Sequence, residues 1–458
     1  MAHTGQKTLS LTDESVNPSK VVILLAAPAL FEGLSRVVTQ YVDTAMVGSL
    51  GSYATAAVGI NMSVLFLLWG IMQAVATAFS VMLAQSIGAS DRGRGQSIIK
   101  HAMVAAVLFG ILLSATMLLL GGAIPLWLGA ADEVAPSAIA YLRIVGGASL
   151  FQSASVVVSG LLRAAGNTKT PFVVNLLANL FNIVCNIILI PQPYVLSIGS
   201  LSVSMYGAGL GVEGAAIATA GSFAFSAVLM TVLFKRANPG VRLFGAFRPD
   251  TVLLREALSL GVPVAFERIV LAVGQIILTA MVAYLGTRAI AAHYVANSIS
   301  TLAFETATGF SIASTTIIAQ CKGACKPALA HTYMLKSLKI GVAVTLVFSA
   351  AVFIGASLFA QLFTIDAQVA ADATVIVRLD AVFEPVFAVA IVLCGVFRGY
   401  GDTRFPFIVS VVGFLGTRLI FGFLLGYLFG LGLLGIWIAI MLDIVTRTLM
   451  CAHHMRKI

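Results

Sequence analysis

The sequence predicts an all-α polytopic membrane protein, with twelve transmembrane helices in two six-helix lobes related by a pseudo-two-fold axis along the membrane normal. Of its 458 residues, 59% are hydrophobic and 10% are charged, whereas roughly a quarter of the residues in soluble domains are charged. About twelve apolar runs are long enough to span a bilayer, and lipid requires such runs to be helices. The stretch 28–59 recurs at 263–294, at an offset of 235 (263 minus 28).

The expected helices follow the chain as six spans and a second set of six. The first set is 21–47, 54–86, 99–128, 137–162, 171–191 and 209–233. The resulting division is an N-terminal tail 1–20, a first lobe 21–234, a linker 235–255, a second lobe 256–450 and a C-terminal tail 451–458. Because each copy has an even number of spans, both copies have the same orientation in the membrane.

Two turn motifs support the duplication. Arg163–Phe172 reads RAAGNTKTPF and Arg398–Phe407 reads RGYGDTRFPF, again 235 apart (398 minus 163). Glycine with Asn or Asp suits a turn, and proline suits the start of the following helix. The symmetry fails at one position of the first repeat, where Asp43 aligns with Leu278 (43 plus 235).

The net charge of +9 follows from the predicted topology. When alternate loops are assigned to opposite sides, the basic loop residues fall on one side, with Arg288 as the exception. The positive-inside rule then predicts an inner (plasma) membrane protein with both termini in the cytoplasm, and the polar stretch Met1–Lys20 does not resemble a signal peptide. We expect no nucleic-acid partner. The five cysteines lack the spacing of a disulfide framework or a zinc site.

Charged residues inside spans are costly, so each needs a partner or a function. Glu32, Arg36 and Asp43 share one face of the first span. Arg36 lies one turn after Glu32, which favours an ion pair within the helix. Asp43 lies roughly 10 Å beyond Arg36 and has no partner on its own helix. A buried carboxylate of this kind can hold a proton or a sodium ion, so Asp43 is the predicted coupling site; the alternative is a structural acid.

The second copy contains further acidic candidates. Glu267 aligns with Glu32, but Leu271 stands where Arg36 would be, so Glu267 has no counter-charge one turn along its helix. The secondary candidates for the coupling or substrate site are Glu267, Glu305, Asp380 and Glu384.

Four asparagines form a polar stripe on the fifth span. They are Asn175, Asn179, Asn182 and Asn186, spaced by four, three and four residues. Amides in membrane helices can bind neighbouring helices together. They can equally form a shell around an ion or proton held by Asp43, and the sequence does not decide between the two roles.

Several motifs are specific in combination, although each is weak alone. They are Pro28 with Asp43-Thr44, Gly48-x-x-Gly51, the two turn motifs, Gly309-Phe310, and Ala319-Gln320-x-x-Gly323-Ala324. With this set the chain resembles the multidrug and toxic compound extrusion (MATE) transporters over nearly its whole length. The resemblance implies alternating access between two lobes, and export of cationic amphipathic compounds against an inward flow of protons or sodium ions.

The resemblance also implies roles for single residues. Asp43 and Asn182 match a span-one aspartate and a span-five asparagine of that family, and Pro28 matches a proline at which span one can bend. Asn186 stands where many members carry an aspartate, a departure that favours protons over sodium. Glu267 and Glu384 each lie about one turn from the acid positions usual in the family.

The expected function is therefore a secondary antiporter with no cofactor beyond a coupling proton or Na⁺. It would work as a monomer among membrane lipids, with small organic cations as substrates. Aromatic side chains of the second lobe would line the substrate cleft by stacking and cation–π contact, although packing against lipid is an alternative role for them. These are Phe266, Phe304, Phe383 and Phe387.

Three rival functions fit the sequence less well. A lipid-linked saccharide flippase of the same superfamily would need a more basic cleft for phosphate. An enzyme is not expected, because no nucleophile and base, metal-ligand cluster or phosphate loop is evident. A channel is disfavoured by two fused lobes of which only one carries the span-one aspartate.

Overall fold

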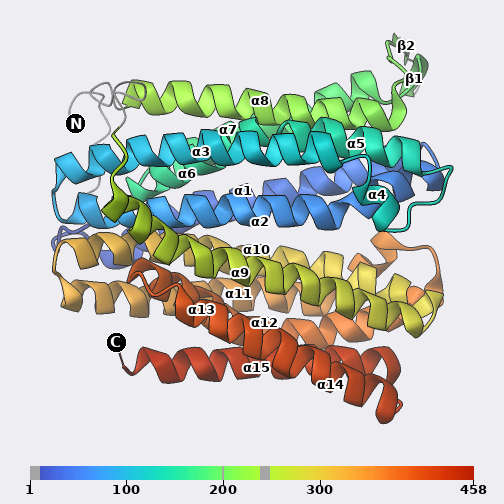
Figure 1. The fold of residues 1–458 in the computed structure, drawn as a ribbon. Coiled ribbons are helices and arrows are strands. Elements are labelled where there is room, and N and C mark those ends of the chain that lie inside the picture. Colours follow the sequence, from blue (N-terminus) through green and yellow to red (C-terminus); the bar gives the residue numbers. More distant parts are fainter. Residues whose placement is uncertain (1–10, 199–200, 238–247, 458) are drawn as a thin grey trace.

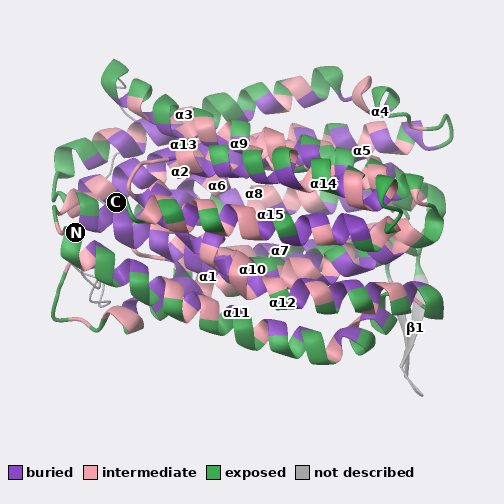
Figure 2. Ribbon diagram, turned by 90° about the horizontal axis from the view of Figure 1, so that it is seen from below, coloured by how far each residue is buried: buried purple, intermediate pink, exposed green. Residues whose placement is uncertain are grey.

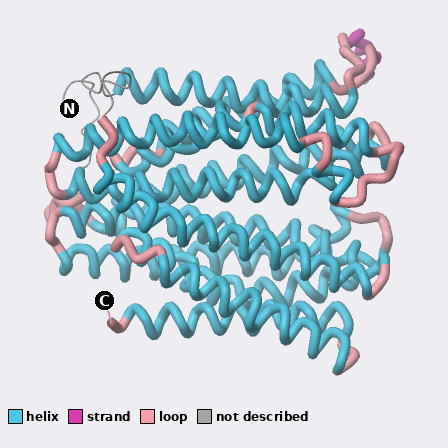
Figure 3. Tube along the Cα trace, viewed as in Figure 1, coloured by secondary structure: helices cyan, strands magenta, loops and turns pink. Residues whose placement is uncertain are grey.

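The computed structural model describes residues 11–198, 201–237 and 248–457 of the chain. Parts of the expected tail 1–20 and linker 235–255 therefore lie outside the described residues. The described chain is helical apart from one hairpin of β1 (Tyr194–Ile198) and β2 (Leu201–Met205), which pair antiparallel with Tyr194 opposite Met205. Figure 3 shows this hairpin beyond the ends of the helices. It occupies the loop after the fifth span, where no strand was predicted.

The N-terminal half of the fold runs from Pro18 to Ala237. Its helices are α1 (Pro18–Gly48), α2 (Ser52–Gly88), α3 (Arg92–Leu120), α4 (Ile124–Trp127), α5 (Ala135–Gly147), α6 (Ser149–Ala164), α7 (Lys169–Leu189) and α8 (Gly211–Ala237).

The C-terminal half runs from Thr251 to Met455. Its α-helices are α9 (Thr251–Tyr284), α10 (Thr287–Gly323), α11 (Pro327–Phe363), α12 (Ala367–Gly399), α13 (Arg404–Ser410), α14 (Ile420–Phe423) and α15 (Gly432–Met455). The segment around α14 is π-helical, in η1 (Val411–Leu419) and η2 (Leu424–Leu428).

The predicted all-helical membrane fold is confirmed. Eleven described helical segments are long and apolar enough to cross a bilayer, and α5 with α6 makes a twelfth span that bends by 43°. The bend follows Gly146-Gly147, and paired small residues are a common cause of such kinks. Pro28 lies inside the continuous helix α1.

The long helices lie side by side, with the start of α1 and the end of α15 at the same end of the bundle (Figure 1). We call this the terminal end, and the opposite end, where α1 meets α2, the far end. Helices α1 and α2 pack against α10 and α9 where the two halves meet. The most buried span is α10, with 72% of its apolar window inside the fold, and Figure 2 shows it near the middle of the bundle.

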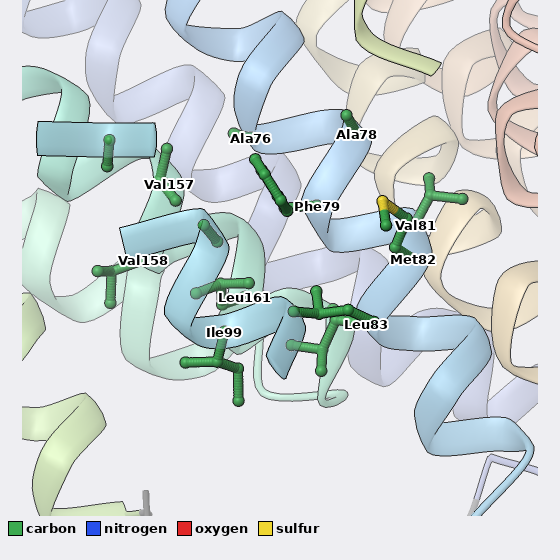
Figure 4. Close-up of a cluster of buried hydrophobic side chains, with 14 of the residues drawn as sticks. Ala76, Ala78, Phe79, Val81, Met82, Leu83, Ile99, Val157, Val158 and Leu161 are labelled. Carbon is green, nitrogen blue, oxygen red and sulfur yellow. The ribbon is translucent and has the colours of Figure 1, made fainter. Parts of the chain in front are cut away.

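The apolar clusters of the described residues differ between the two ends. Near the terminal end one cluster joins the halves, combining Phe79 and Met82 of α2 with Leu253 and Leu260 of α9; Figure 4 shows part of it. A second joins α1 to α10 and α12. The clusters nearer the far end each stay within one half. Among the described residues, the buried apolar clusters that join the halves therefore lie near the terminal end, whereas nearer the far end the halves meet in smaller contacts such as that between the Tyr41 and Phe363 rings, whose centroids are 5.5 Å apart.

The backbone of the sealed end repeats the two-fold relation. A Cβ on Gly88 would overlap the carbonyl oxygen of Gln320, and a Cβ on Gly323 would overlap that of Gln85, each 235 residues from its counterpart (323 minus 88 and 320 minus 85). The Gln85 amide donates to the Gly399 carbonyl at 3.2 Å, and the Gln320 amide donates to the Ala164 carbonyl at 2.7 Å. Glycine is required here because the two backbones leave no room for a side chain.

Candidate functional site

An ion pair lies inside the N-terminal half. Arg163, at the end of α6, donates to Glu32 of α1 at 2.5 Å, and Asn175 of α7 donates to the same carboxylate oxygen at 2.8 Å. The expected pair of Glu32 with Arg36 is wrong. Glu32 packs toward α6 and α7, so its counter-charge comes from a neighbouring helix rather than from one turn along its own.

The C-terminal half contains the same arrangement. Arg398 donates to both oxygens of Glu267 at 2.7 and 2.8 Å, and Ser410 donates to Glu267 at 3.3 Å. The sequence separations match the N-terminal half: 131 residues for each arginine and 143 for each second donor. The expectation that Glu267 lacks a counter-charge is therefore wrong. Both glutamates belong to one frame that the halves share.

Asp43 has a different environment. Its Oδ1 accepts a hydrogen bond from Asn186 Nδ2 at 2.6 Å. Asn186 also donates to Asn182 Oδ1 at 3.1 Å, and Asn182 Nδ2 lies 3.5 Å from the Thr219 hydroxyl. Within the described residues, no Lys, Arg or His nitrogen lies within 4.0 Å of the Asp43 carboxylate. Asn186 Oδ1 is buried and has no partner. The site is one carboxylate, with an amide acceptor beside it that remains free.

The asparagine stripe of α7 faces α1. Asn175 contacts Glu32, Asn179 donates to Ser35 Oγ at 3.0 Å, and Asn186 contacts Asp43. The stripe therefore joins the two helices and also surrounds Asp43, so both roles considered from the sequence are compatible with its contacts. The pseudo-equivalent of Asp43, Leu278, is 1% exposed in an apolar cluster.

Apart from Glu267, the acidic candidates of the C-terminal half lie in two places. Asp380 and Glu384 are one turn apart on α12, and both are buried. Asp380 accepts a hydrogen bond from the Ser300 hydroxyl, while Glu384 Oε2 is buried without a partner. Glu305 lies elsewhere, at the contact between the halves, where Arg36 donates to it at 2.6 Å. The structure thus does not bring the secondary candidates into one group.

Another polar cluster of this half has no N-terminal copy. Asp443 of α15 is fully buried and accepts from Arg447 at 2.5 Å and from Arg418 of η1 at 2.8 Å. Both guanidinium groups also lie over the Phe414 ring, at 4.4 Å for Arg418 and 5.9 Å for Arg447. Arg418 and Asp443 are charged residues inside apolar runs of the sequence, but no sequence signal predicted the π-helix or Arg447 as a partner.

Aromatic contacts surround some of the predicted substrate residues. Phe266 lies 6.4 Å from Phe407 between ring centroids, and the equivalent N-terminal pair Phe31 and Phe172 has the same spacing. Phe304 lies 6.0 Å from Phe387. Phe383 packs at the edge of the apolar cluster of this half. Their role in substrate binding stays a prediction.

One aromatic residue at the contact between the halves, Trp69, was not predicted from the sequence. The Trp69 ring of α2 lies 4.9 Å from the guanidinium carbon of Arg36 and 5.6 Å from that of Arg268. The charged residues in the neighbouring spans were the only sequence signal for this contact, because nothing in the sequence singles out Trp69.

The described residues contain no group of three or more His, Cys, Asp or Glu side chains that could hold a metal ion.

Comparison with known proteins gives consistent matches. A family described as MatE matches residues 28–188 and 263–424. A "Probable multidrug resistance protein NorM" of Thermotoga maritima is 29% identical over 434 residues, which cover 94% of this chain and 90% of that protein. An "Uncharacterized transporter YisQ" of Bacillus subtilis is 25% identical, covering 91% and 89% of the two chains.

Solved structures match at the level of the fold. The structure described as "Crystal structure of MATE in complex with MaD3S" has a TM-score of 0.88 at 23% identity, over 99% of this chain and 98% of that one. The "Outward-facing conformation of a multidrug resistance MATE family transporter of the MOP superfamily" has a TM-score of 0.88 at 22% identity, with the same coverage.

Proposed function

The chain belongs to the MatE family of multidrug efflux transporters, and on that premise we propose that it is an antiporter that exports organic cations in exchange for protons. It is a multi-pass membrane protein and a transporter rather than an enzyme. We propose that segments 21–234 and 256–450 are the moving lobes, with Pro28 as a hinge in α1. We further propose that the protein works as a monomer in the inner membrane, with membrane lipids around it.

The terminal end is proposed to face the cytoplasm. The basic loop residues cluster on the side of both termini, as the positive-inside rule requires of cytoplasmic loops. Since the apolar clusters that join the halves lie near this end, the structure corresponds to a transporter closed toward the cytoplasm. Alternating access then requires these contacts to part while the far ends of the halves close.

Asp43 is the proposed coupling residue. The observation that supports it is its contact set: one amide donor, no cation within ion-pair distance in the described chain, and a free amide oxygen beside it. Holding an unpaired carboxylate inside a membrane protein costs several kcal/mol, so proton binding relieves that cost. A half-turn of the Asn186 amide would present its oxygen to the proton of a neutral Asp43. One amide thus serves both protonation states.

Protons are the proposed coupling ions because the site has a single carboxylate. Hard cations are bound by several oxygen ligands, with carboxylates prominent among them. Around Asp43 the polar side chains are amides and the hydroxyls of Thr219 and Tyr141, and Asn186 presents an amide nitrogen rather than its oxygen to the carboxylate.

The proposed cycle couples this site to substrate. Asp43 releases its proton to the cytoplasm, the substrate binds between the lobes, and protonation from outside favours release of the substrate on that side. Phe304 and Phe387 would stack on the aromatic part of the substrate, and Glu384, which has a free buried oxygen, would attract its positive charge.

Transport in proteoliposomes tests the proposal. We expect a pH gradient, and not a sodium gradient, to drive ethidium transport. Asp43→Asn should reduce the driven rate by about tenfold or more, which corresponds to at least about 1.4 kcal/mol of lost coupling. Asp372→Asn makes the same chemical change in an exposed ion pair at the far end and should transport as the unaltered protein does. Full coupling in Asp43→Asn would refute the assignment.

A further inference from the structure

Two arginines from opposite halves share one aromatic ring at the centre of the protein. Arg36 comes from α1 and Arg268 from α9, and their guanidinium carbons lie 4.9 and 5.6 Å from the centroid of the Trp69 ring. The nearby acid is Glu305, which accepts from Arg36 at 2.6 Å. The group therefore carries two positive charges and one negative charge, and is cationic overall.

Arg268 makes no described hydrogen bond or ion pair. Its Nε is buried and has no acceptor. The adjacent Glu267 accepts hydrogen bonds from Arg398 and Ser410, and none is described from Arg268. Glu305 accepts from Arg36 through Oε1, and it too has no described hydrogen bond from Arg268. A guanidinium has five donors in a planar fork and cannot lose its charge inside a protein. Leaving such a group unpaired within the membrane is costly, and an anion beside it would remove that cost.

Arg36 lies on the exposed surface between the halves. One face of α1 packs on α7 through Asp43, and another packs on α10, where Tyr41 donates to the Ser298 carbonyl at 2.5 Å. Arg36 and Gln40 lie between these two faces and are exposed, on the opposite side of the helix from Val38. The Arg36 side chain is 46% exposed. A molecule between the halves can therefore reach this group.

Glycines make the close approach of these side chains possible. A Cβ on Gly70 of α2 would lie 2.9 Å from Arg268 Cβ. A Cβ on Gly33 of α1 would overlap the Glu305 carboxylate. The two glycines align with the two charged residues across the repeat, since 33 plus 235 is 268 and 70 plus 235 is 305. In each of these two contacts, a charged side chain of the C-terminal half packs against a glycine of the N-terminal half. The Arg268 and Glu305 side chains are thereby held at the centre of the protein.

We propose that Arg268 and Arg36 bind an anionic group of the substrate, with the Trp69 ring packing against its aromatic body. The substrate class is then an aromatic amphiphile that carries a carboxylate in addition to its positive charge. Arginine binds carboxylate through parallel hydrogen bonds, and its plane stacks on indole. A cation without an anionic group would meet a net positive charge here. The inference refines the proposed export function, but its binding test does not depend on transport.

Two dyes that differ by one group test this proposal. Rhodamine 110 is an aromatic cation with a free carboxylate, and rhodamine 123 is its methyl ester. Dissociation constants are measured by fluorescence polarisation on the full-length protein in detergent. We expect the carboxylate dye to bind about tenfold more tightly than the ester, because the ester cannot form the charge-assisted hydrogen bonds that arginine makes to a carboxylate. Equal affinities, or tighter binding of the ester, would overturn the proposal without any variant being needed.

Single-residue variants test whether the preference for the carboxylate dye depends on Arg268. Arg268→Gln should weaken binding of the carboxylate dye by about tenfold and change binding of the ester by less than about twofold. Arg378→Gln is the matched control, since Arg378 is exposed on α12 against Phe353, and it should retain the preference. A preference that survives in Arg268→Gln, or one lost equally in both variants, contradicts the assignment. If driven transport of ethidium fails in proteoliposomes while the binding preference holds, the export proposal fails and the anion site stands.

Discussion

The two halves of the molecule share a structural frame and differ in the polar groups outside it. Glu32 with Arg163 and Glu267 with Arg398 are the same ion pair at the same sequence separation. Asp43, by contrast, aligns with Leu278. The difference extends to its neighbours, because Asn182 and Asn186 align with Thr417 and Phe421 (each plus 235).

The C-terminal half differs in the opposite direction. Asp380 and Glu384 of α12 align with Val145 and Ser149, and Asp443 aligns with Ala208 (each minus 235). Each half thus carries acids within its spans that the other lacks. The ion pairs kept in both copies hold helices together. Of the acids found in one copy, Asp443 is paired with two arginines, whereas Asp43 and Glu384 make no ion pair among the described residues. The comparison therefore singles out Asp43 and Glu384 as the acids proposed to bind a proton or substrate.

The largest predicted effect comes from breaking the shared ion pair. Arg163→Gln leaves Glu32 buried without a counter-charge and should lower the free energy of unfolding by about 3–5 kcal/mol. Arg398→Gln should cost less, because Arg268 remains beside Glu267, whereas the N-terminal position aligned with Arg268 is Gly33. Urea or thermal unfolding in detergent measures both. Equal losses would show that Arg268 gives Glu267 no support, and the exposed Arg378→Gln should change little.

A medium effect is expected at the sealed end. Gly88→Ala and Gly323→Ala each place a methyl group against the backbone of the other half and should disfavour the sealed form by about 1–3 kcal/mol. Spin labels at Arg92→Cys and Ala328→Cys would report the separation of the halves as a shift toward longer distances.

The two alanine variants should act alike, because their surroundings repeat. Gly59→Ala is the control, since no atom lies within 4 Å of a Cβ at that position. An effect in Gly88→Ala but not in Gly323→Ala would mean that the two symmetry-related contacts contribute unequally to the stability of the sealed form.

The smallest effect concerns a charge pair found only in the C-terminal half. Arg288 donates to Asp372 at 2.6 and 2.8 Å, while the aligned N-terminal residues are Tyr53 and Ser137. Both side chains are solvent-exposed, at 53% and 37%. Asp372→Asn should therefore change the free energy of unfolding by less than about 1 kcal/mol. A larger loss would mean that an unshared charge can also be structural.

The sequence predicted the helices and the duplication well, because both depend on local apolar length and on a constant offset. It predicted ion pairs poorly. Arg36 lies one turn from Glu32, and the local rule for helices favours that pair, but the packing of α6 against α1 supplies Arg163 instead. Arg163 and Arg398 were visible as repeated turn residues, yet their partners lie 131 residues away. The π-helix at Val411–Leu419 had no sequence signal, because its turns are set by packing around Asp443.

At the sealed end, a glycine of each half contacts a glutamine of the other half, and the symmetry-related copy of that glutamine lies three residues before the glycine in its own half. Gly88 faces Gln320, which is the copy of Gln85, and Gly323 faces Gln85 itself. If a single half were present as two separate chains, Gly88 of each would meet Gln85 of the other, and the same seal would form. Glu32, Arg163 and Asn175 would be complete within each chain. The seal between the halves thus has the geometry of a two-fold symmetric homodimer interface, which is the arrangement that duplication and fusion of one half would retain.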